Sequence, residues 1–232
     1  MKQVDLMMRK TAAALLMLMT APFAAAEEVS GLPALTAAMN GLFVVVPTDP
    51  ATGATMMEVV KKPDGTEQQV VVAFLDARDA ARTAEKAGLA DRAEGRVVNA
   101  VELISLAKGE VIWRTNDENA VLVDGDNKRP PLFYITGPGD DPLVQPVEGK
   151  QKIVFYTDAV AADAARVAAQ NSLSAAGQPT ELAVLAADMI NIMEGIGSGK
   201  VKDAYIASSP TIIIWAAQWE QGKRLIRDYN PN

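Results

Sequence analysis

Segments in the first half of this sequence recur in the same order in the second half, and this similarity limits the folds that the chain can adopt. "GLFVVVPTD" at residues 41–49 corresponds to "PLFYITGPG" at 131–139, because both contain a Leu-Phe pair followed by a β-prone run. "QVVVAFLDARDAARTAEKAG" at 69–88 corresponds to "QKIVFYTDAVAADAARVAAQ" at 151–170, where a strand and an Asp precede an Ala-rich helix. Two copies of one strand-and-helix unit explain these matches, and shared Ala-rich composition is the alternative.

A third pair of segments follows the Ala-rich helices. "VELISLAKG" at residues 101–109 aligns without a gap to "ADMINIMEG" at 187–195, and a further strand follows each of them. "DGT" at 64–66 and "EGK" at 148–150 are predicted hairpin turns within the two units. The sequence therefore predicts an α/β (α+β) fold with two similar halves from an internal duplication, related by a pseudo-twofold axis, in which helices pack on mixed sheets.

The chain divides accordingly into four parts. We predict a signal peptide at residues 1–26, a first repeat at 27–123, a linker at 124–131 and a second repeat at 132–232. The linker is assigned because this stretch is polar and ends in two prolines.

Residues 1–26 have the features of a secretory signal peptide. Basic residues in "MKQVDLMMRK" precede the short apolar run "TAAALLMLM", and "AAA" at 24–26 supplies the small residues of a cleavage site. The apolar run is about half of the ~20 residues that span a bilayer, and an N-terminal membrane anchor is the alternative. Met8 is an alternative start, because the stretch from Met8 onward is a complete leader. We expect an exported, periplasmic protein without stable membrane insertion.

The charge of the remaining chain disfavours two classes of partner. Removing residues 1–26 takes away three of the 22 basic and one of the 29 acidic side chains, which leaves a net charge of −9. An acidic surface repels nucleic-acid backbones, and no Lys/Arg cluster with interleaved aromatic residues occurs, so no nucleic-acid partner is expected. Attraction to anionic lipid is disfavoured for the same reason.

The sequence contains neither His nor Cys, and this excludes most familiar hydrolase mechanisms. A Ser-His-Asp triad, a Cys-His pair, a zinc site of nitrogen and sulfur ligands and a disulfide all need residues that are absent. Carboxylate-only or Ser/Lys schemes remain, but their ingredients occur in any soluble protein. We therefore predict no catalytic residue and no cofactor.

The glycine-rich stretch "GIGSGK" at residues 195–200 resembles a phosphate-binding loop. A Walker loop needs a Gly where Glu194 stands and a Ser or Thr where Val201 stands. The dinucleotide pattern needs a strand before the glycines, whereas here an apolar helix is expected to precede them. Because Gly195 aligns with Gly109, we interpret the stretch as a helix-ending loop with Gly195 at the cap.

Polar residues mark where the helices are expected to begin. Asp76 and Asp158 stand directly before the Ala-rich helices, where a carboxylate accepts free backbone N–H groups. Ser209 is a possible cap for "PTIIIWAAQWE", with Pro210 in the first turn. The Ile run of this last segment is β-prone, so that a strand competes with the predicted helix.

Two acidic stretches resemble fragments of calcium-binding loops. "DDP" at residues 140–142 and "DGDNK" at 124–128 contain suitable oxygen ligands. Neither has the twelve-residue pattern that ends in a Glu, so surface turns are expected and no metal site is predicted.

The repeated order of these segments resembles the Tic-twenty-two-like (Tic22-like) family, the soluble component of chloroplast protein import with its cyanobacterial and other bacterial relatives. The resemblance covers most of the chain after the leader and rests on fold-marking residues and on "YIASSP" at 205–210. Those residues are Phe43, Phe74, Asp76 and Ala80 in the first half, and Phe133, Tyr156, Asp158 and Ala164 in the second. The polar stretch "VLVDGDNKRP" at 121–130 departs from the family pattern, because a helix is expected there.

The resemblance implies a non-enzymatic, chaperone-like carrier that acts in protein translocation or outer-membrane biogenesis. Its partners would be unfolded or envelope proteins, held on apolar surface, and the oligomeric state is left open. The candidate partner-binding residues are Phe43, Phe133, Ile212, Trp215 and Trp219. For Ile212, Trp215 and Trp219, which form one helical stripe, packing into the core is the alternative.

Three other functions remain open at this point. A structural subunit of an envelope complex would use the repeated strands as an interface. A carboxylate-based hydrolase, such as a glycosidase, would need two acidic side chains flanking a cleft. A small-ligand binding protein would need a pocket between the halves.

Overall fold

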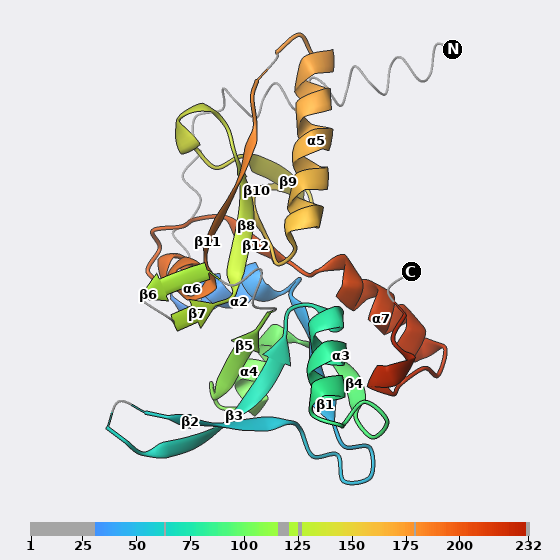
Figure 1. The fold of residues 1–232 in the computed structure, drawn as a ribbon. Coiled ribbons are helices and arrows are strands. Elements are labelled where there is room, and N and C mark those ends of the chain that lie inside the picture. The colour runs from blue at the N-terminus through green and yellow to red at the C-terminus, as the bar shows by residue number, and fades with distance from the viewer. Residues whose placement is uncertain (1–30, 63, 116–120, 125–126, 179, 231–232) are drawn as a thin grey trace.

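The computed structural model describes residues 31–62, 64–115, 121–124, 127–178 and 180–230 of the chain (Figure 1). It contains two mixed sheets, one in each half, with helices packed on them. The predicted α+β class with two similar halves is confirmed. The predicted signal peptide lies outside the described residues. Among the described residues, no helix combines the length and apolar character that crossing a membrane requires.

The first sheet is built around β3. Both β1 and β2 pair antiparallel with β3, β5 pairs parallel with it, and β4 pairs antiparallel with β1. The strands of this sheet are β1 (Phe43–Thr48), β2 (Met57–Lys61), β3 (Glu67–Phe74), β4 (Glu94–Asn99) and β5 (Val111–Arg114).

The second sheet repeats this pairing scheme around β10. Both β8 and β9 pair antiparallel with β10, β12 pairs parallel with it, and β11 pairs antiparallel with β8. The strands of this sheet are β8 (Pro131–Thr136), β9 (Val144–Val147), β10 (Lys150–Tyr156), β11 (Ala183–Asp188) and β12 (Ala204–Ala207). The two halves therefore have the same topology.

The helices occupy matching places along the two halves. An Ala-rich helix follows β3 and β10, a short apolar helix follows β4 and β11, and one further helix stands at each end of the described chain. They are α2 (Leu32–Met39), α3 (Ala77–Lys86), α4 (Ala100–Leu106), α5 (Ala159–Ala175), α6 (Met189–Gly197) and α7 (Pro210–Glu220). Short 3₁₀ turns follow β8 and α7, at Pro138–Asp140 and Ile226–Asp228.

Asp76 and Asp158 are the N-caps predicted for α3 and α5. Each side chain accepts a hydrogen bond from a backbone N–H in the first turn of its helix. Ser209 caps α7 in the same way, and Pro210 occupies the first turn. The β-prone Ile run is therefore helical, because the cap and the packing of its apolar face outweigh local propensity.

The strand pairing corrects the alignment of the first strands of the repeats. Val45 pairs with Phe74, and Phe133 pairs with Tyr156, so that Phe133 occupies the position of Val45 rather than that of Phe43. The shift is two residues, which keeps the same face of the strand, because side chains alternate with a period of two. The repeated Leu-Phe pairs thus match in sequence but not in register.

The short apolar helices are also shifted relative to the gap-free alignment. Asn99 caps α4 and Asp188 caps α6, which makes these two residues equivalent. Gly195 consequently lies inside α6, and the prediction that it ends the helix is wrong. Gly199, with a φ of 75°, has the left-handed conformation that Gly109 has after α4. The glycine-rich stretch still links a helix to a following strand, as expected of a helix-ending loop.

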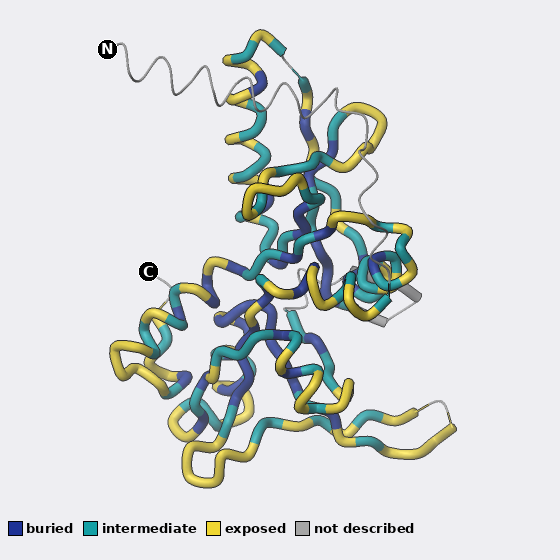
Figure 2. Tube along the Cα trace, turned by 180° about the vertical axis from the view of Figure 1, so that it is seen from behind, coloured by how far each residue is buried: buried dark blue, intermediate teal, exposed yellow. Residues whose placement is uncertain are grey.

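One hydrophobic core connects the two halves. In Figure 2, buried residues are concentrated in the sheets and around the junction, whereas the β2–β3 hairpin is mostly exposed. The largest cluster combines residues from both sheets, among them Met39, Val44, Leu75, Trp113, Leu132, Phe155, Met189 and Ile206. The halves are therefore two similar sheets on a shared core rather than two separate domains.

The segment after each parallel strand crosses to the other half. After β12, α7 packs on α3, β1 and β4 of the first half. After β5, the hairpin of β6 (Val121–Asp124) and β7 (Asn127–Arg129) lies against β11 of the second half. This hairpin occupies most of the stretch that departs from the family pattern. It also occupies part of the predicted linker at 124–131, which ends at the first residue of β8.

β4, β11 and α2 are elements that the sequence patterns did not predict. β4 and β11 run directly into α4 and α6, so no turn residue separates strand from helix. Asn99 and Asp188 are each the last residue of a strand and the cap of the next helix. Because strands are recognised by the turn residues that bound them, these two merged into the apolar segments that follow.

Candidate partner-binding surface

The second half presents an apolar groove along α5. Asp158 starts this helix by accepting a hydrogen bond from the Ala161 N–H over 2.8 Å. Ala162 and Leu173 on its inner side are buried, and Leu173 packs on Ile135 and Leu182. Gly177, with a φ of 75°, ends the helix in a left-handed conformation.

The groove lies between one flank of α5 and the Pro-rich segment that joins β8 to β9 and continues into β9. Its volume is about 600 Å³, and most residues of the segment 137–146 line one wall. The other wall carries small side chains of α5, and Leu182 completes the lining together with Leu173. The small side chains are Ala165, Ala168, Ala169 and Ser172. Because these side chains are short, another backbone could approach the helix closely.

Polar groups are few in the groove. Asp141 is the one charged residue among the described residues that line it. Gln145 accepts a hydrogen bond from the Tyr156 hydroxyl over 2.7 Å, which fixes the start of β9 against β10. Burial raises the pKa of Tyr156, and this hydrogen bond partly opposes the rise. The groove is thus mainly an apolar surface with one negative charge at its rim.

Exposed apolar side chains extend this surface over the outer face of α5. Val160 is 74% exposed and Val167 is 42% exposed. They are two turns apart and share a face with Ala164, as the helical repeat requires. Val160 and Val167 therefore add exposed apolar side chains to this helix outside the groove.

The structure separates the predicted partner-binding residues. Phe43 is 43% exposed at the start of β1, and its backbone N–H donates to Ser208 Oγ over 2.7 Å. Phe133 is half-buried on β8, where it pairs with Ala186. These two aromatic residues lie on different sheets.

The Ile and Trp stripe of α7 is mainly core. Ile212 and Trp215 are each 1% exposed, so they offer no surface to a partner, and the core alternative is correct for them. The Trp215 indole N–H donates to the Gly95 carbonyl. The centroids of the Trp215 and Tyr229 rings lie 5.2 Å apart in an edge-to-face arrangement. Trp219 is half-buried, with the Arg224 guanidinium 5.0 Å from its ring centre.

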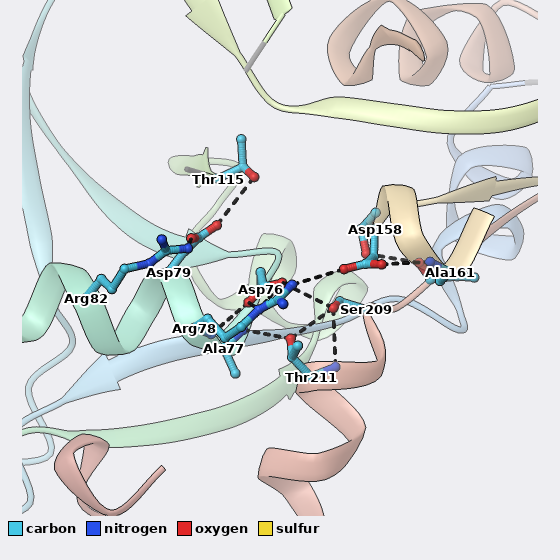
Figure 3. Close-up of polar contacts among 12 residues, drawn as sticks. Asp76, Ala77, Arg78, Asp79, Arg82, Thr115, Asp158, Ala161, Ser209 and Thr211 are labelled. Carbon is cyan, nitrogen blue, oxygen red and sulfur yellow. Dashed lines mark hydrogen bonds and ion pairs between the residues drawn. The ribbon is translucent and has the colours of Figure 1, made fainter. Parts of the chain in front are cut away.

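A polar cluster joins the N-termini of α3, α5 and α7 (Figure 3). The Arg78 guanidinium bonds to Asp76 at 2.6 Å and to Asp158 at 3.2 Å, so that one cation bridges the caps of both halves. Ser209 and Thr211 from α7 complete it: their hydroxyls lie 2.9 Å apart, and Thr211 Oγ1 accepts from the Ala77 N–H. The hydrogen bond to Asp76 raises the pKa of Arg78.

This cluster has the paired acids that a carboxylate-based hydrolase would need, but both carboxylates are already engaged. Each accepts a helix N-terminal N–H and binds Arg78. A hydrolase would need these carboxylates to face a bound substrate, whereas their oxygens contact helix N–H groups and the Arg78 guanidinium instead. The arrangement is suited to holding the two halves together.

No group of acidic residues among the described positions is arranged to hold a metal ion. The "DDP" stretch, considered as a calcium-loop fragment, lies at the rim of the groove, where Asp141 and Pro142 line it. The "DGDNK" stretch falls at β6 and β7, partly outside the described residues.

The groove is not among the features predicted from the sequence. Its wall on α5 is predicted only as an Ala-rich helix, and the opposing segment only as a turn. The available signal was that both features sit in one repeat: α5 is two turns longer than α3, and the loop facing it is rich in Pro and Gly. Length and loop composition together distinguish the second half from the first.

Comparison with known proteins supports the fold. No family model matches the sequence, and no curated protein sequence does. Among solved structures, Tic22 of Anabaena, a protein described as acting in protein transport, matches with a TM-score of 0.55 at 8% identity, over 85% of this chain and 98% of its own. Tic22 of Plasmodium falciparum matches with a TM-score of 0.55 at 14% identity, over 81% of this chain and 98% of its own.

At these identities the likeness concerns the fold. It extends over nearly the whole length of both Tic22 structures, so that both halves and their arrangement are shared. The resemblance expected from the repeated segments is therefore confirmed as a Tic22-like fold.

Proposed function

We propose that this chain, which has a Tic22-like fold, takes part in protein transport as a non-enzymatic carrier that holds apolar segments of client proteins. The binding site is the groove along α5 together with the exposed valines on the outer face of this helix. The protein acts after export, in the periplasm, as the leader sequence suggests.

The groove is the observation that carries this proposal. A volume of about 600 Å³ with mostly apolar lining accommodates a few side chains of an extended segment. Its open form and small residues on one wall favour a chain that lies along the helix. A mainly apolar lining recognises side chains by burial, which tolerates many sequences, as a carrier of varied clients requires.

The chemistry of the remaining chain supports binding rather than catalysis. Without His and Cys, the common nucleophiles and proton shuttles are absent. Asp76 and Asp158, the two carboxylates bound to Arg78, serve as helix caps. The net charge of −9 after removal of the leader keeps a protein with exposed apolar surface soluble. The description of Anabaena Tic22 as a protein of protein transport agrees with this assignment.

The test uses the natural absence of cysteine. In the chain without residues 1–26, Ser172→Cys introduces a unique thiol in the groove, and Ser105→Cys introduces one at an exposed position of α4 in the first half. Each thiol is labelled with a benzophenone and irradiated with an unfolded client. We expect crosslinks at position 172 to exceed those at 105 several-fold, together with suppressed client aggregation near equimolar ratio.

The alternatives give other outcomes. No suppression and equal crosslinking at both positions would refute the carrier proposal. Stable co-purification with one envelope protein, without binding to unfolded clients, would indicate a structural assembly subunit instead. Ser172→Arg against Ser105→Arg is a second matched pair, since only the former places a cation in the apolar groove.

A further inference from the structure

One end of the α5 groove carries three exposed carboxylates. Asp141 lines the groove, Asp140 precedes it in the same loop, and Glu181 precedes Leu182, which also lines the groove. None of these three carboxylates has an ion-pair partner within the described part of the chain. Their charges are therefore available to a bound segment.

Backbone contacts bring the two acidic segments to the same end of the groove. β11 begins opposite Thr136, and Pro142, directly after the acidic loop, forms a bridge to the same residue. Just before β11, the Leu182 N–H donates to the side-chain oxygen of Gln170 over 3.2 Å. Because Gln170 belongs to α5, both acidic segments lie beside the last two turns of this helix.

The end of α5 adds to the negative potential there. This helix has 17 residues and no basic residue in its last turn. The carbonyl groups at a helix C-terminus carry a partial negative charge, which a cation nearby would stabilise. The loop and the helix end thus favour the same kind of partner group.

The basic residues of the surrounding elements are directed elsewhere. Arg166, the one basic residue of α5, is bonded to Asp163 over 2.8 Å. The segment 137–146 contains no basic residue. On β10, the Lys152 ammonium lies 5.4 Å from the centre of the Tyr205 ring of β12, on the edge of β10 opposite to β9. The chain itself therefore leaves the acidic end of the groove without a countercharge from these elements.

We propose that the α5 groove prefers client segments in which a lysine or arginine stands next to an apolar stretch. This inference rests on the proposed carrier function and adds the class of client to it. The apolar side chains of the segment are buried in the groove, and the cation lies at its acidic end. Lysine and arginine suit this position because their apolar stems can pack on the groove wall while the charged head reaches an exposed carboxylate.

Two physical arguments define the preference further. No acidic group among the described residues is arranged to hold a metal ion, so the cation that fits is a side chain of the client. The carboxylates are exposed, so each ion pair contributes little, and we expect a preference of about three- to tenfold rather than strict selection. The same exposure makes the preference dependent on salt, and it should shrink between about 0.05 and 0.5 M salt.

Three model peptides test the preference. They share one apolar core of leucine and alanine and end in two lysines, two glutamines or two glutamates, with an uncharged fluorophore at the other end. Fluorescence anisotropy measures their binding to the chain without residues 1–26. We expect the lysine peptide to bind about three- to tenfold more tightly than the glutamine peptide, and the glutamate peptide to bind most weakly.

A variant without the three carboxylates tests their role. Asp140→Asn combined with Asp141→Asn and Glu181→Gln should reduce the ratio between the lysine and glutamine peptides to below about twofold, with the glutamine peptide itself bound as before. The matched control changes the net charge by the same amount at exposed residues of the first half and should keep the wild-type ratio. It combines Glu67→Gln, Glu85→Gln and Glu110→Gln.

The outcomes distinguish this inference from the function on which it rests. Equal affinities of the wild type for the three peptides would overturn the charge preference and leave the groove as a site for apolar segments. A ratio that falls equally in both triple variants would also overturn it, because net charge and not the groove end would then be responsible. Failure of all three peptides to bind would instead refute the carrier proposal itself.

Discussion

At the scale of single residues, Arg78 accounts for how two similar halves meet without symmetry. Asp76 and Asp158 are equivalent caps, and a strictly repeated sequence would place a second arginine two residues after Asp158. Val160 stands there instead and is largely exposed. One guanidinium can bind both carboxylates, whereas two would repel each other at the junction. The same substitution gives α5 one of its exposed apolar residues, so a single difference serves both the junction and the candidate binding surface.

Replacing Arg78 with methionine is expected to destabilise the protein. Asp76 and Asp158 would keep their buried charges without a cation, and we expect the free energy of unfolding to fall by about 1–2 kcal/mol. Part of the Arg78 side chain is exposed, which limits the effect. Urea denaturation measures the change. Arg227→Met, which removes a more exposed arginine paired with Asp91, serves as the control, with an expected change below about 0.5 kcal/mol.

Two half-buried tyrosines, Tyr156 and Tyr229, differ in their hydrogen bonding and should respond differently to loss of the hydroxyl. The Tyr156 hydroxyl donates to Gln145, whereas the buried Tyr229 hydroxyl makes no hydrogen bond of ordinary geometry to the described residues. Tyr156→Phe is expected to lower the free energy of unfolding by about 1 kcal/mol at neutral pH. Tyr229→Phe should be neutral or slightly stabilising. Equal losses in urea denaturation would contradict this distinction.

The raised pKa of Tyr229 gives a prediction at alkaline pH. Burial, followed by the charge of Asp76, raises the pKa of Tyr229. Above about pH 10 the unfolded chain releases this proton while the folded chain retains it, so stability falls as the pH rises through this range. Tyr229→Phe should therefore reduce the loss of stability between about pH 9 and 11. Parallel pH profiles of the two proteins would show that Tyr229 does not contribute.

At the scale of elements, the sequence predicts those helices and hairpins that begin or end at a characteristic capping or turn residue. The caps at Asp76, Asp158 and Ser209 and the hairpin turn at Glu148 and Gly149 were recognised because their residue types serve few other purposes. β4 and β11 lack such ends and were missed. The groove was missed for a different reason: it arises from two elements that face each other only in the folded chain, and neither is unusual alone.

The packing of α7 on β4 depends on a residue without a side chain. A Cβ added to Gly95 would lie 2.9 Å from ring atoms of Trp215, which is itself fully buried. Gly95→Ala is therefore expected to displace the indole and lower the free energy of unfolding by about 2 kcal/mol. Gly137→Ala is the matched control, because no atom lies within 4 Å of the position that its Cβ would take and its φ of −92° suits alanine. Chemical denaturation with near-UV circular dichroism distinguishes the two, and equal stabilities would show that α7 tolerates a shift.

At the scale of the whole molecule, the similarity of the halves does not make them independent. The sequence suggested two units side by side, each with its own strands and helices. The structure adds a common core and an exchange of segments, in which α7 covers the first half and the β6–β7 hairpin contacts the second. Repeated patterns of strands and helices are visible in a sequence, whereas contacts between the repeats depend on side chains far apart along the chain. Arg129 and Asp188, which form an ion pair at 3.0 Å across this exchange, carry no local sign of their pairing.

This arrangement predicts that neither half folds alone. Residues 27–130 would expose the apolar face that Ile212 and Trp215 cover, and residues 131–232 would leave α7 without a surface to pack on. Each half would also expose its part of the shared core, where loss of a single large side chain already costs about 2–5 kcal/mol. Expressed separately, both should lack a cooperative thermal transition by circular dichroism, whereas co-expression should yield a complex that unfolds in one transition. A cooperative transition in either isolated half would show that its own sheet suffices, and the shared core would then be an interface between two domains.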